Sequence, residues 1–523
     1  MKIMMLILLN ILFLYTSMYD LQMLQQNSYN AKNRYYNFFV KDIRKNYKVY
    51  LLKFLFTVGL FMFVKLNKLI QIVFVFVLLV LIIDAYYRYK KHNVKLPLKF
   101  TKRMIRIIAV DYFFLLLVES LFFIFPTNFF SGMVMVIITA HSSVLTGVIK
   151  FLSPLEKLIY RKYKNRALTK LSKMPNLDII GITGSFGKTS TKMILDTILK
   201  TEYKGFYTPG SFNTPNGVLL TINNEPTIFN DYFICEMGAK NIGDIRELCD
   251  IVHPKYGILT SVGKAHLESF GSLENVCLTK FELIESLPEG GVAILNKDDE
   301  YQRKYEMFNN PEIIWVGIDK KADVMAKNIK VTSSGTTFDI VFRKGNKIKV
   351  DTILLGKANI YNILAAAALA NHMGISDKKI IQGIKNIDPI SHRLELKKHG
   401  NITILDDAFN SNPKGAQTAL EVLSLMDGNK IIITPGMIEM GIEQDKLNEE
   451  FGRQIAKTCD KVYLIGKNQT KPIYEGLIKE KYNEDNIKVY NSFKEAYDDA
   501  VKSSKKASTI LIENDLPDSY MEG

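Results

Sequence analysis

The chain has 523 residues, of which 47% are hydrophobic and 23% charged, and its formal net charge is +15. It is long enough for several domains, since one domain usually takes about 100–200 residues. The surplus positive charge is concentrated in the first third, in three blocks at 32–48, 88–103 and 157–173 that flank apolar runs. This distribution is typical of a membrane protein and argues against nucleic-acid binding.

Five apolar segments predict an α-helical transmembrane domain of about four or five spans at residues 1–151. They are residues 4–15, 49–64, 69–87, 104–125 and 129–151. A spanning helix needs about 20 apolar residues, and the last three segments supply them. With five spans the basic blocks would all face the cytoplasm, together with everything after residue 151. The prediction is a multi-pass cell-membrane protein with cytoplasmic catalytic domains.

Charged residues interrupt the fourth apolar segment, and a basic stretch follows the fifth. Asp111 and Glu119 lie inside the segment, where charge is costly and often functional, so they are candidates for a substrate path. Residues 152–175 predict a basic amphipathic linker helix on the inner leaflet, ending at Pro175.

From residue 176 onward, short apolar runs alternate with helical periodicity, which is the pattern of parallel sheets flanked by helices. We expect two α/β domains: a central P-loop, parallel-sheet ATP-binding domain at 176–390 and a C-terminal Rossmann-like domain at 391–523. The expected strands are 179–183, 232–236, 256–262, 402–405, 430–434, 462–465 and 509–513.

The segment GITGSFGKTS at 181–190 predicts a phosphate-binding loop between a strand and a helix. Glycines let successive N–H groups face a phosphate, and the helix N-terminus adds positive potential. Lys188 would neutralise the β- and γ-phosphate oxygens, and the Thr189 hydroxyl would hold Mg²⁺. The residues expected to bind nucleotide in this loop are Gly184, Ser185, Phe186, Gly187, Lys188, Thr189 and Ser190.

A lysine lies in the apolar stripe of the helix expected at 273–287. Lys280 is four residues from both Val276 and Ile284. Burying an ammonium group is costly unless it is paired or neutralised. A lysine held partly neutral can react with CO₂ to form a carbamate, which is a metal ligand. The alternative is a lysine that extends from the helix edge to solvent.

The segment GITGSFGKTSTK resembles the ATP loop of the Mur ligases, which build the peptide stem of the bacterial cell wall. The resemblance is nearest to the branch that adds D-alanyl-D-alanine, and it runs from about residue 177 to 523. The first 175 residues do not resemble that branch. Further matching segments, in order, are TPGSFNTPNGVLLT (208–221), CEMGAKNIGDI (235–245), ILTSVGKAHLESFGSLENVCLTK (258–280), LNKDD (295–299), GKANIYNILAAAALA (356–370) and LDDAFNSNPKGAQTAL (405–420).

The resemblance implies a role for each matching position. Glu236 and His266 would be metal ligands together with Thr189, and Lys280 matches a position that the family carbamoylates. Arg393 would reach the ATP phosphates. By the same resemblance, Asn362 would contact adenine and Asp407 would lie near the ribose. The residues expected to be catalytic are Lys188, Glu236, His266, Lys280 and Arg393, and those expected to contact substrate are Asn213, Thr214, Asn216 and Asn412.

Three positions depart from the family pattern. Ala358 replaces a histidine near the adenine site, and Phe409 replaces the tyrosine of DDxYNANP, which keeps the ring and loses the hydroxyl. Gly436, in PGMIEMG (435–441), replaces the aspartate of GDMLELG. Asn410 and Pro413 are retained and should shape the loop after Asp407.

The implied reaction joins a carboxylate to the amine of an amino acid or dipeptide. ATP and two Mg²⁺ ions would form an acyl phosphate and ADP, and the amine would then displace phosphate. Apolar segments stand where cytoplasmic Mur ligases have a UDP-sugar domain. We therefore expect a membrane-presented acceptor: a lipid-linked peptidoglycan precursor, a teichoic or capsular glycan, or a poly-γ-glutamate-like chain. The alternatives are a P-loop NTPase that energises a transporter or senses nucleotide, and a degenerate nucleotide-binding scaffold.

Overall fold

The structure is a computed structural model, and it divides the chain into two compact units. One unit extends over Met1–Ile159 and the other over Tyr160–Asp515. The residues that the structure describes are 2–27, 29, 39–40, 43–44, 47–61, 68–91, 97–124, 133–134, 136–138, 140–225, 227–409, 411–504 and 507–515.

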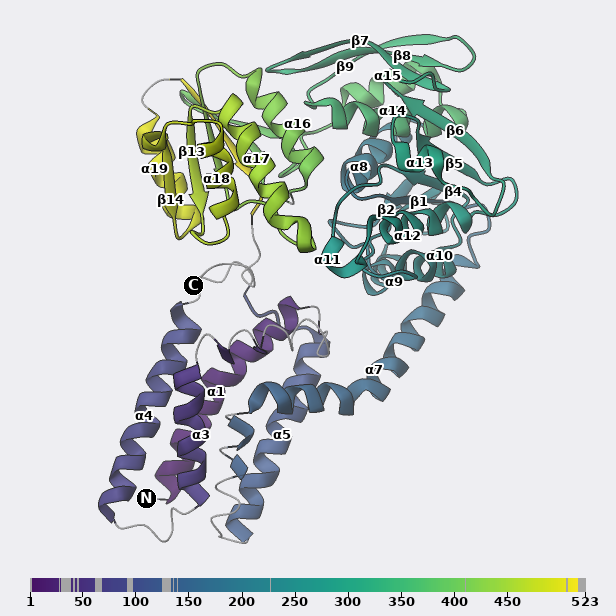
Figure 1. The fold of residues 1–523 in the computed structure, drawn as a ribbon. Coiled ribbons are helices and arrows are strands. Elements are labelled where there is room, and N and C mark those ends of the chain that lie inside the picture. The colour runs from purple at the N-terminus through teal and green to yellow at the C-terminus, as the bar shows by residue number, and fades with distance from the viewer. Residues whose placement is uncertain are drawn as a thin grey trace. The chain divides into compact units, whose positions relative to one another are not determined.

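The first unit is helical (Figure 1). Its long helices are α1 (Lys2–Gln26), α3 (Tyr47–Phe61), α4 (Lys68–Lys91), α5 (Lys102–Ile124) and the start of α7 (His141–Leu171). Helix α7 runs without a break through Pro154. The structure therefore differs from the separate linker helix expected at 152–175, because one helix extends across the predicted boundary and ends before Pro175.

Within the described residues, one helix has the length and composition that a membrane span requires. The stretch Ile7–Gln26 of α1 is long and apolar enough to cross a membrane, whereas Val75–Tyr87 of α4 is too short. Helix α5 carries charges at Arg106, Asp111 and Glu119. The predicted spans at 49–64, 104–125 and 129–151 fall partly on residues outside the described ranges. The prediction of four or five spans is therefore not confirmed.

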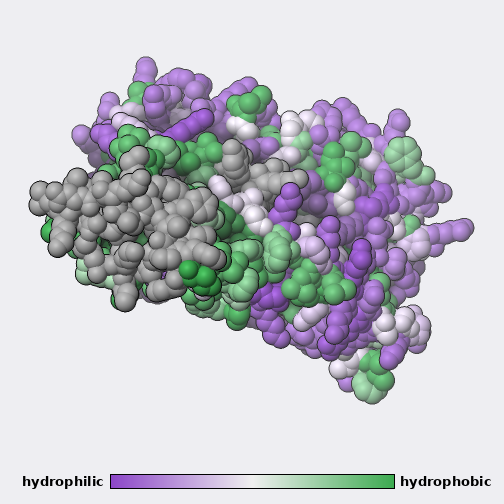
Figure 2. Space-filling model, turned by 90° about the horizontal axis from the view of Figure 1, so that it is seen from below, coloured by the Kyte–Doolittle hydropathy of each residue, from purple (hydrophilic) through white to green (hydrophobic). Residues whose placement is uncertain are grey.

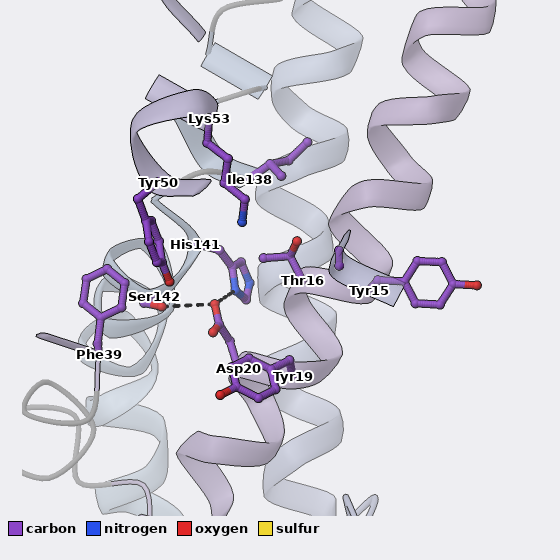
Figure 3. Close-up of a pocket in the computed structure, with 11 residues that line it drawn as sticks. Tyr15, Thr16, Tyr19, Asp20, Phe39, Tyr50, Lys53, Ile138, His141 and Ser142 are labelled. Atoms are coloured by element: carbon purple, nitrogen blue, oxygen red, sulfur yellow. Dashed lines mark hydrogen bonds and ion pairs between the residues drawn. The ribbon is translucent and has the colours of Figure 1, made fainter. Parts of the chain in front are cut away.

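Asp111 and Glu119, the charged residues proposed from the sequence for a substrate path, form buried polar contacts between helices. His141 Nδ1 lies 2.7 Å from Asp20 Oδ2, and its Nε2 lies 3.0 Å from Asp111 Oδ2 (Figure 3 shows His141 above Asp20). Carboxylates only accept hydrogen bonds, so both ring nitrogens must donate unless one carboxyl group holds the proton. Glu119 accepts a hydrogen bond from Asn10 at 2.6 Å. These contacts link α1 to α5 and α7, and the substrate-path role stays a prediction.

The second unit begins with a mostly parallel sheet, in which nine strands are ordered β2-β3-β1-β4-β5-β6-β7-β8-β9 in the described part of the chain. Pairing is parallel from β2 to β7 and antiparallel between β7, β8 and β9. The strands are β1 (Asp178–Thr183), β2 (Gly205–Tyr207), β3 (Tyr232–Glu236), β4 (Tyr256–Leu259), β5 (Val292–Asn296), β6 (Glu312–Gly317), β7 (Val324–Thr332), β8 (Gly335–Phe342) and β9 (Lys347–Thr352).

Helices cover both faces of this sheet because alternate strand residues point to opposite sides. Ile180 and Ile182 of β1 pack with α8, α14 and α15, whereas Ile179 packs in the other core with α9, α10 and α12. The helices are α8 (Lys188–Leu199), α9 (Pro215–Asn224), α10 (Asp244–Val252), α11 (Leu267–Phe270), α12 (Leu273–Glu285), α13 (Glu300–Lys304), α14 (Lys357–His372) and α15 (Asp377–Lys385).

A second sheet follows, with the strand order β10-β11-β15-β12-β13-β14, parallel except for β10. Its strands are β10 (Glu395–His399), β11 (Ile402–Asp407), β12 (Asn429–Thr434), β13 (Lys461–Ile465), β14 (Ile487–Tyr490) and β15 (Ser508–Glu513). Its helices are α16 (Pro413–Ser424), η3 (Gly441–Glu443), α17 (Gln444–Thr458), α18 (Lys471–Lys479), η4 (Glu484–Asn486) and α19 (Phe493–Ser503). The predicted pair of α/β domains is confirmed.

Candidate active site

The loop between β1 and α8 is built around two glycines with positive φ. Gly184 has a φ of 149°, and a Cβ there would lie 2.0 Å from Thr260 Oγ1. Gly187 has a φ of 85°, and a Cβ there would lie 2.5 Å from Asn362 Oδ1. Larger residues would be both strained and blocked, so the glycines permit the tight turn that ends in the N-terminus of α8.

The lysine of this loop folds back over it. Lys188 Nζ donates to Gly184 O at 2.7 Å. Burial lowers the pKa of Lys188 to about 8, although the nearby Glu236 opposes that shift. The first-turn N–H groups of α8 lack intrahelical acceptors, and they begin where Lys188 and Thr189 stand. Such an arrangement suits an anion.

A carboxylate at the end of β3 has polar partners from two segments, helix α8 and the loop before α9. Thr189 Oγ1 donates to Glu236 Oε2 at 3.0 Å, and Lys192 Nζ lies 2.8 Å from the same oxygen. Asn213 Nδ2 donates to Oε1 at 3.0 Å. Burial raises the pKa of Glu236, but Lys192 and Lys188 outweigh it and lower that pKa overall. Glu236 is therefore held ionised at the carboxyl edge of the sheet, where ligands bind in such folds.

The lysine expected in an apolar stripe is buried, as predicted. Lys280 of α12 is 3% exposed, and within the described residues no carboxylate lies at ion-pair distance from it. Burial, reinforced by the charge of Lys188, lowers its pKa to about 7. A substantial fraction of this amine is thus neutral near pH 7, as carbamate formation requires.

The predicted histidine is joined to the second α/β domain. His266 has a φ of 54° and stands at the start of α11, and its Nδ1 hydrogen-bonds Glu439 Oε2. Burial lowers the pKa of His266 although Glu439 acts in the opposite direction, and the charge of Lys188 lowers it further. Lys188 therefore acts electrostatically on Glu236, Lys280 and His266 alike.

The donor set fits a magnesium ion that also binds phosphate. Thr189 Oγ1 and the Glu236 carboxylate are oxygen ligands, which Mg²⁺ prefers, and Mg²⁺ commonly keeps one or two protein ligands beside phosphates and water. Across the described stretches of the chain, no cluster of three His, Cys, Asp or Glu side chains could hold a metal by itself. A second ion would need His266 and a carbamate on Lys280.

Asn362, which is expected to contact adenine, hydrogen-bonds the helix that follows the phosphate loop. Asn362 Oδ1 accepts from Thr191 Oγ1 at 3.1 Å, and its Nδ2 donates to Asn359 Oδ1 at 3.2 Å. Asn362 and Tyr361 also line a small cavity beside β4 and β5. Ala358, which replaces the family's histidine, is exposed at the start of the same helix, α14. An adenine contact by Asn362 stays a prediction.

Arg393, Asp407 and Phe409 lie close together in the segments after α15. The guanidinium of Arg393 lies 4.2 Å from the centroid of Phe409, so the ring that replaces the family's tyrosine carries this contact. Burial raises the pKa of Asp407 to about 7, although Arg393 opposes the shift. Glu513, which is fully buried beside Asp407, accepts from Ser411 Oγ at 2.6 Å.

The four residues expected to contact substrate have different surroundings. Asn213 belongs to the Glu236 cluster. Thr214 and Asn216 are exposed at the start of α9. Asn412 is the N-cap of α16, where its side chain accepts from the Gly415 N–H at 2.9 Å. Asn410 lies outside the described residues.

The glycine that departs from the family pattern has a conformational reason. Gly436 has a φ of 80°, and a Cβ there would lie 2.8 Å from Asn448 Oδ1. Asn448 accepts from the Met437 N–H at 2.8 Å and donates to Met437 O at 2.9 Å. An aspartate would collide with this amide, so the turn of this chain requires glycine.

Sequence reasoning missed four residues that the structure brings into the site. They are Lys192, Thr260, Glu439 and Glu513. Lys192 had a detectable signal, because it follows Lys188 by four residues and so lies on the same helical face. Glu439 and Glu513 had none, because their partners are 173 and 102 residues away in the chain.

Two family models match the chain. The Mur ligase middle domain matches residues 182–370, and the Mur ligase, glutamate ligase domain matches residues 392–513. A solved relative, the MurF ligase from Thermotoga maritima in complex with ADP, superposes with a TM-score of 0.62 at 26% identity. That match covers 69% of this chain and 81% of that one.

Two curated relatives are named UDP-N-acetylmuramoyl-tripeptide--D-alanyl-D-alanine ligase. The Escherichia coli (strain K12) protein is 33% identical over 293 residues, which are 55% of this chain and 64% of that protein. The Bacillus subtilis (strain 168) protein is 29% identical over 339 residues, 64% of this chain and 72% of that protein. The chain thus spans slightly less than two thirds of the E. coli relative. With both family models matched in order over more than half of its length, the chain belongs to the Mur ligase family.

Proposed function

We propose that the protein is an ATP-dependent ligase that forms an amide bond between a cell-envelope carboxylate and the amine of an amino acid or dipeptide. The observation that carries the proposal is the convergence of the phosphate loop, the Glu236 cluster and a buried, partly neutral Lys280 at one sheet edge. A nucleotidase that only energises or senses would not need a buried lysine there.

The chemistry explains why positive charge is concentrated at this edge. A carboxylate does not react with an amine at neutral pH, because its oxygen is a poor leaving group. Transfer of the γ-phosphoryl group of ATP to that oxygen gives an acyl phosphate and ADP, and attack by the amine then releases phosphate. Lys188 and Arg393 would neutralise the repulsion between the two anions. Mg²⁺ would supply further neutralisation, held by Thr189 and Glu236 and, at a second position, by His266 and carbamoylated Lys280.

The relatives' names support a substrate pair. We propose a muramoyl-tripeptide carboxylate as acceptor and D-alanyl-D-alanine as amine, because two curated relatives are named for that pair. The Glu236–Asn213 contact lies in segments that resemble the same branch. Teichoic, capsular and poly-γ-glutamate chains are the alternative acceptors.

The first unit supports a membrane location, which we include in the proposal. Large apolar side chains are exposed on its helices, and hydrophobic residues form contiguous areas in Figure 2. Examples on α3, α4 and α5 are Leu51, Phe54, Leu55, Ile72, Val73, Phe76, Ile83, Phe113 and Leu116. Exposed apolar area of this extent marks an interaction surface, and lipid is the occupant that a spanning-length α1 favours. The acceptor would then be lipid-linked.

The test uses full-length protein in nanodiscs with ATP and Mg²⁺. Soluble UDP-linked tripeptide or its lipid-linked counterpart is supplied with a panel of amino acids and dipeptides, and release of ADP and phosphate is measured with product mass. We expect release that depends on both D-alanyl-D-alanine and acceptor, faster with the lipid-linked form. Lys188→Ala should abolish it, whereas Lys200→Ala, on the exposed end of the same helix, should not. AMP and pyrophosphate, or hydrolysis independent of amine, would refute the ligase proposal.

A further inference from the structure

A second lysine of the phosphate-loop helix is buried and fully bonded, and the proposed chemistry does not use it. Lys192 is 1% exposed, and its Nζ lies 2.8 Å from Glu236 Oε2. The same nitrogen donates to Thr208 O at 2.8 Å and Gly210 O at 2.6 Å. An ammonium group has three hydrogens, so these acceptors saturate it.

The two carbonyls belong to the loop 208–214, which joins β2 to α9. This loop is attached to the end of β3 by further bonds. Thr208 Oγ1 accepts from the Glu236 N–H at 3.0 Å, and the Gly238 N–H donates to Asn213 O at 2.8 Å. A Cβ on Gly238 would lie 2.7 Å from Asn213 Cγ, so this close approach requires glycine. Loop and strand end therefore form one unit, with Lys192 as the buried charge between them.

The energetics argue for a specific task rather than for stability alone. A buried ion pair is often no more stabilising than apolar residues of the same volume, because both charges lose their hydration. An apolar side chain could pack α8 against β3, but it could not fix two carbonyls and a carboxylate at once. What an ammonium group adds is a defined geometry among three segments.

We propose that Lys192 is a positioning residue that holds loop 208–214, with Asn213 and Thr214, in register with Glu236. This inference rests on the proposed function, in which that loop contacts the acceptor and Glu236 binds Mg²⁺. Removal of Lys192 should free the loop and weaken acceptor binding. It should leave the nucleotide contacts of Lys188 and the loop glycines in place.

The experiment compares Lys192→Met with Lys200→Met in the full-length protein. Lys200 caps the same helix, is exposed, and bonds Asp196 at 2.6 Å. Hydrogen exchange of the 208–214 amides is measured without ligands, where we expect about tenfold faster exchange in Lys192→Met only. In steady-state assays, KM for the muramoyl-tripeptide acceptor should rise about tenfold or more, and by a larger factor than KM for ATP, because Lys188 still lowers the pKa of Glu236.

Each other outcome is decisive. Unchanged loop exchange in a folded Lys192→Met variant overturns the inference, as does a fall in kcat with both KM values unchanged. If that variant does not fold, Lys192→Gln, which keeps a donor of shorter reach, is measured in its place. An inactive wild-type protein contradicts the proposed function alone, since the exchange measurement still tests the anchoring of the loop.

Discussion

The imidazole Nδ1 of His266 hydrogen-bonds the carboxylate of Glu439, and the two residues come from different α/β domains of the second unit. Glu439 O also accepts from the Glu268 N–H at 3.3 Å, and Lys264 forms an ion pair with Glu443 nearby. A carboxylate behind a histidine fixes the tautomer and leaves Nε2 to bind a metal. The proposed second metal site therefore depends on a residue of the other domain.

Glu439→Gln tests this dependence. Loss of the carboxylate should loosen the orientation of His266 and raise the Mg²⁺ concentration for half-maximal ADP release about 10- to 100-fold. Glu443→Gln is the matched control, because it removes a neighbouring contact between the same segments without touching His266. Equal Mg²⁺ dependence in the two variants would show that the Glu439 contact only joins the domains.

Phe409 tests the contact with Arg393. An exposed cation–π contact contributes about 0.5–1 kcal/mol, so Phe409→Ala should raise KM for ATP about two- to fivefold. Phe409→Tyr keeps the ring and restores the family's hydroxyl, and its KM should equal that of the wild type or fall below it. An unchanged KM in Phe409→Ala would mean that Arg393 does not need the ring.

The parallel core of both domains could be predicted from the sequence, because its strands are continuous apolar runs bounded by turns. Strand β1, with the pattern DIIGIT, has this signature. Strands β7 (VMAKNIKVT) and β9 (KIKVDT) form an antiparallel extension that was not predicted, although the alternation in KIKVDT is typical of a half-buried strand. Register and pairing there depend on contacts with β8 that no local pattern encodes.

The residues of the candidate site also fall into those that could be predicted from the sequence and those that could not. Lys188 and Thr189 are contiguous in one motif, and Lys280 was visible because a charge interrupts an apolar helical stripe. Glu439 and Glu513 act through partners far away in the chain, so only the fold brings them to the site. Asn412, which is expected to contact substrate, serves as the N-cap of α16, and its substrate contact stays a prediction.

Gly436→Asp restores the family's residue at a position where this chain has a φ of 80°. We expect a loss of about 1–3 kcal/mol in the free energy of unfolding, because the backbone becomes strained and the new Cβ meets Asn448. Gly345→Asp, at a φ of 88° with nothing near its Cβ, separates backbone strain from collision. Chemical denaturation measures both, and equal losses would eliminate the collision with Asn448 as a cause.

ADP release should depend on CO₂, because Lys280 needs it to form a carbamate. If its amine becomes a carbamate, Lys280→Ala should abolish ADP release, and short carboxylic acids should restore part of it by supplying the missing oxygens. Lys280→Arg cannot form a carbamate and should stay inactive with those acids. Full activity of the wild type in CO₂-free buffer, with an unmodified Lys280 mass, would contradict the carbamate.

Asp407 should make the stability of the second unit depend on pH. Its pKa is raised by burial to about 7 in the folded protein, against about 3.9 for an unperturbed aspartate. Below about pH 4 both states hold the proton, so its favourable contribution is complete there. As the pH rises to about 7, only the unfolded state ionises, and that contribution is lost.

The comparison is with Asp407→Asn, which cannot ionise. The free energy of unfolding of the wild type, relative to that variant, should fall between about pH 4 and pH 7 and stay constant above it. Asp388→Asn, which changes an exposed aspartate, should run parallel to the wild type. Parallel curves for wild type and Asp407→Asn would contradict the prediction, because they would mean that the pKa of Asp407 is the same in the folded and unfolded states.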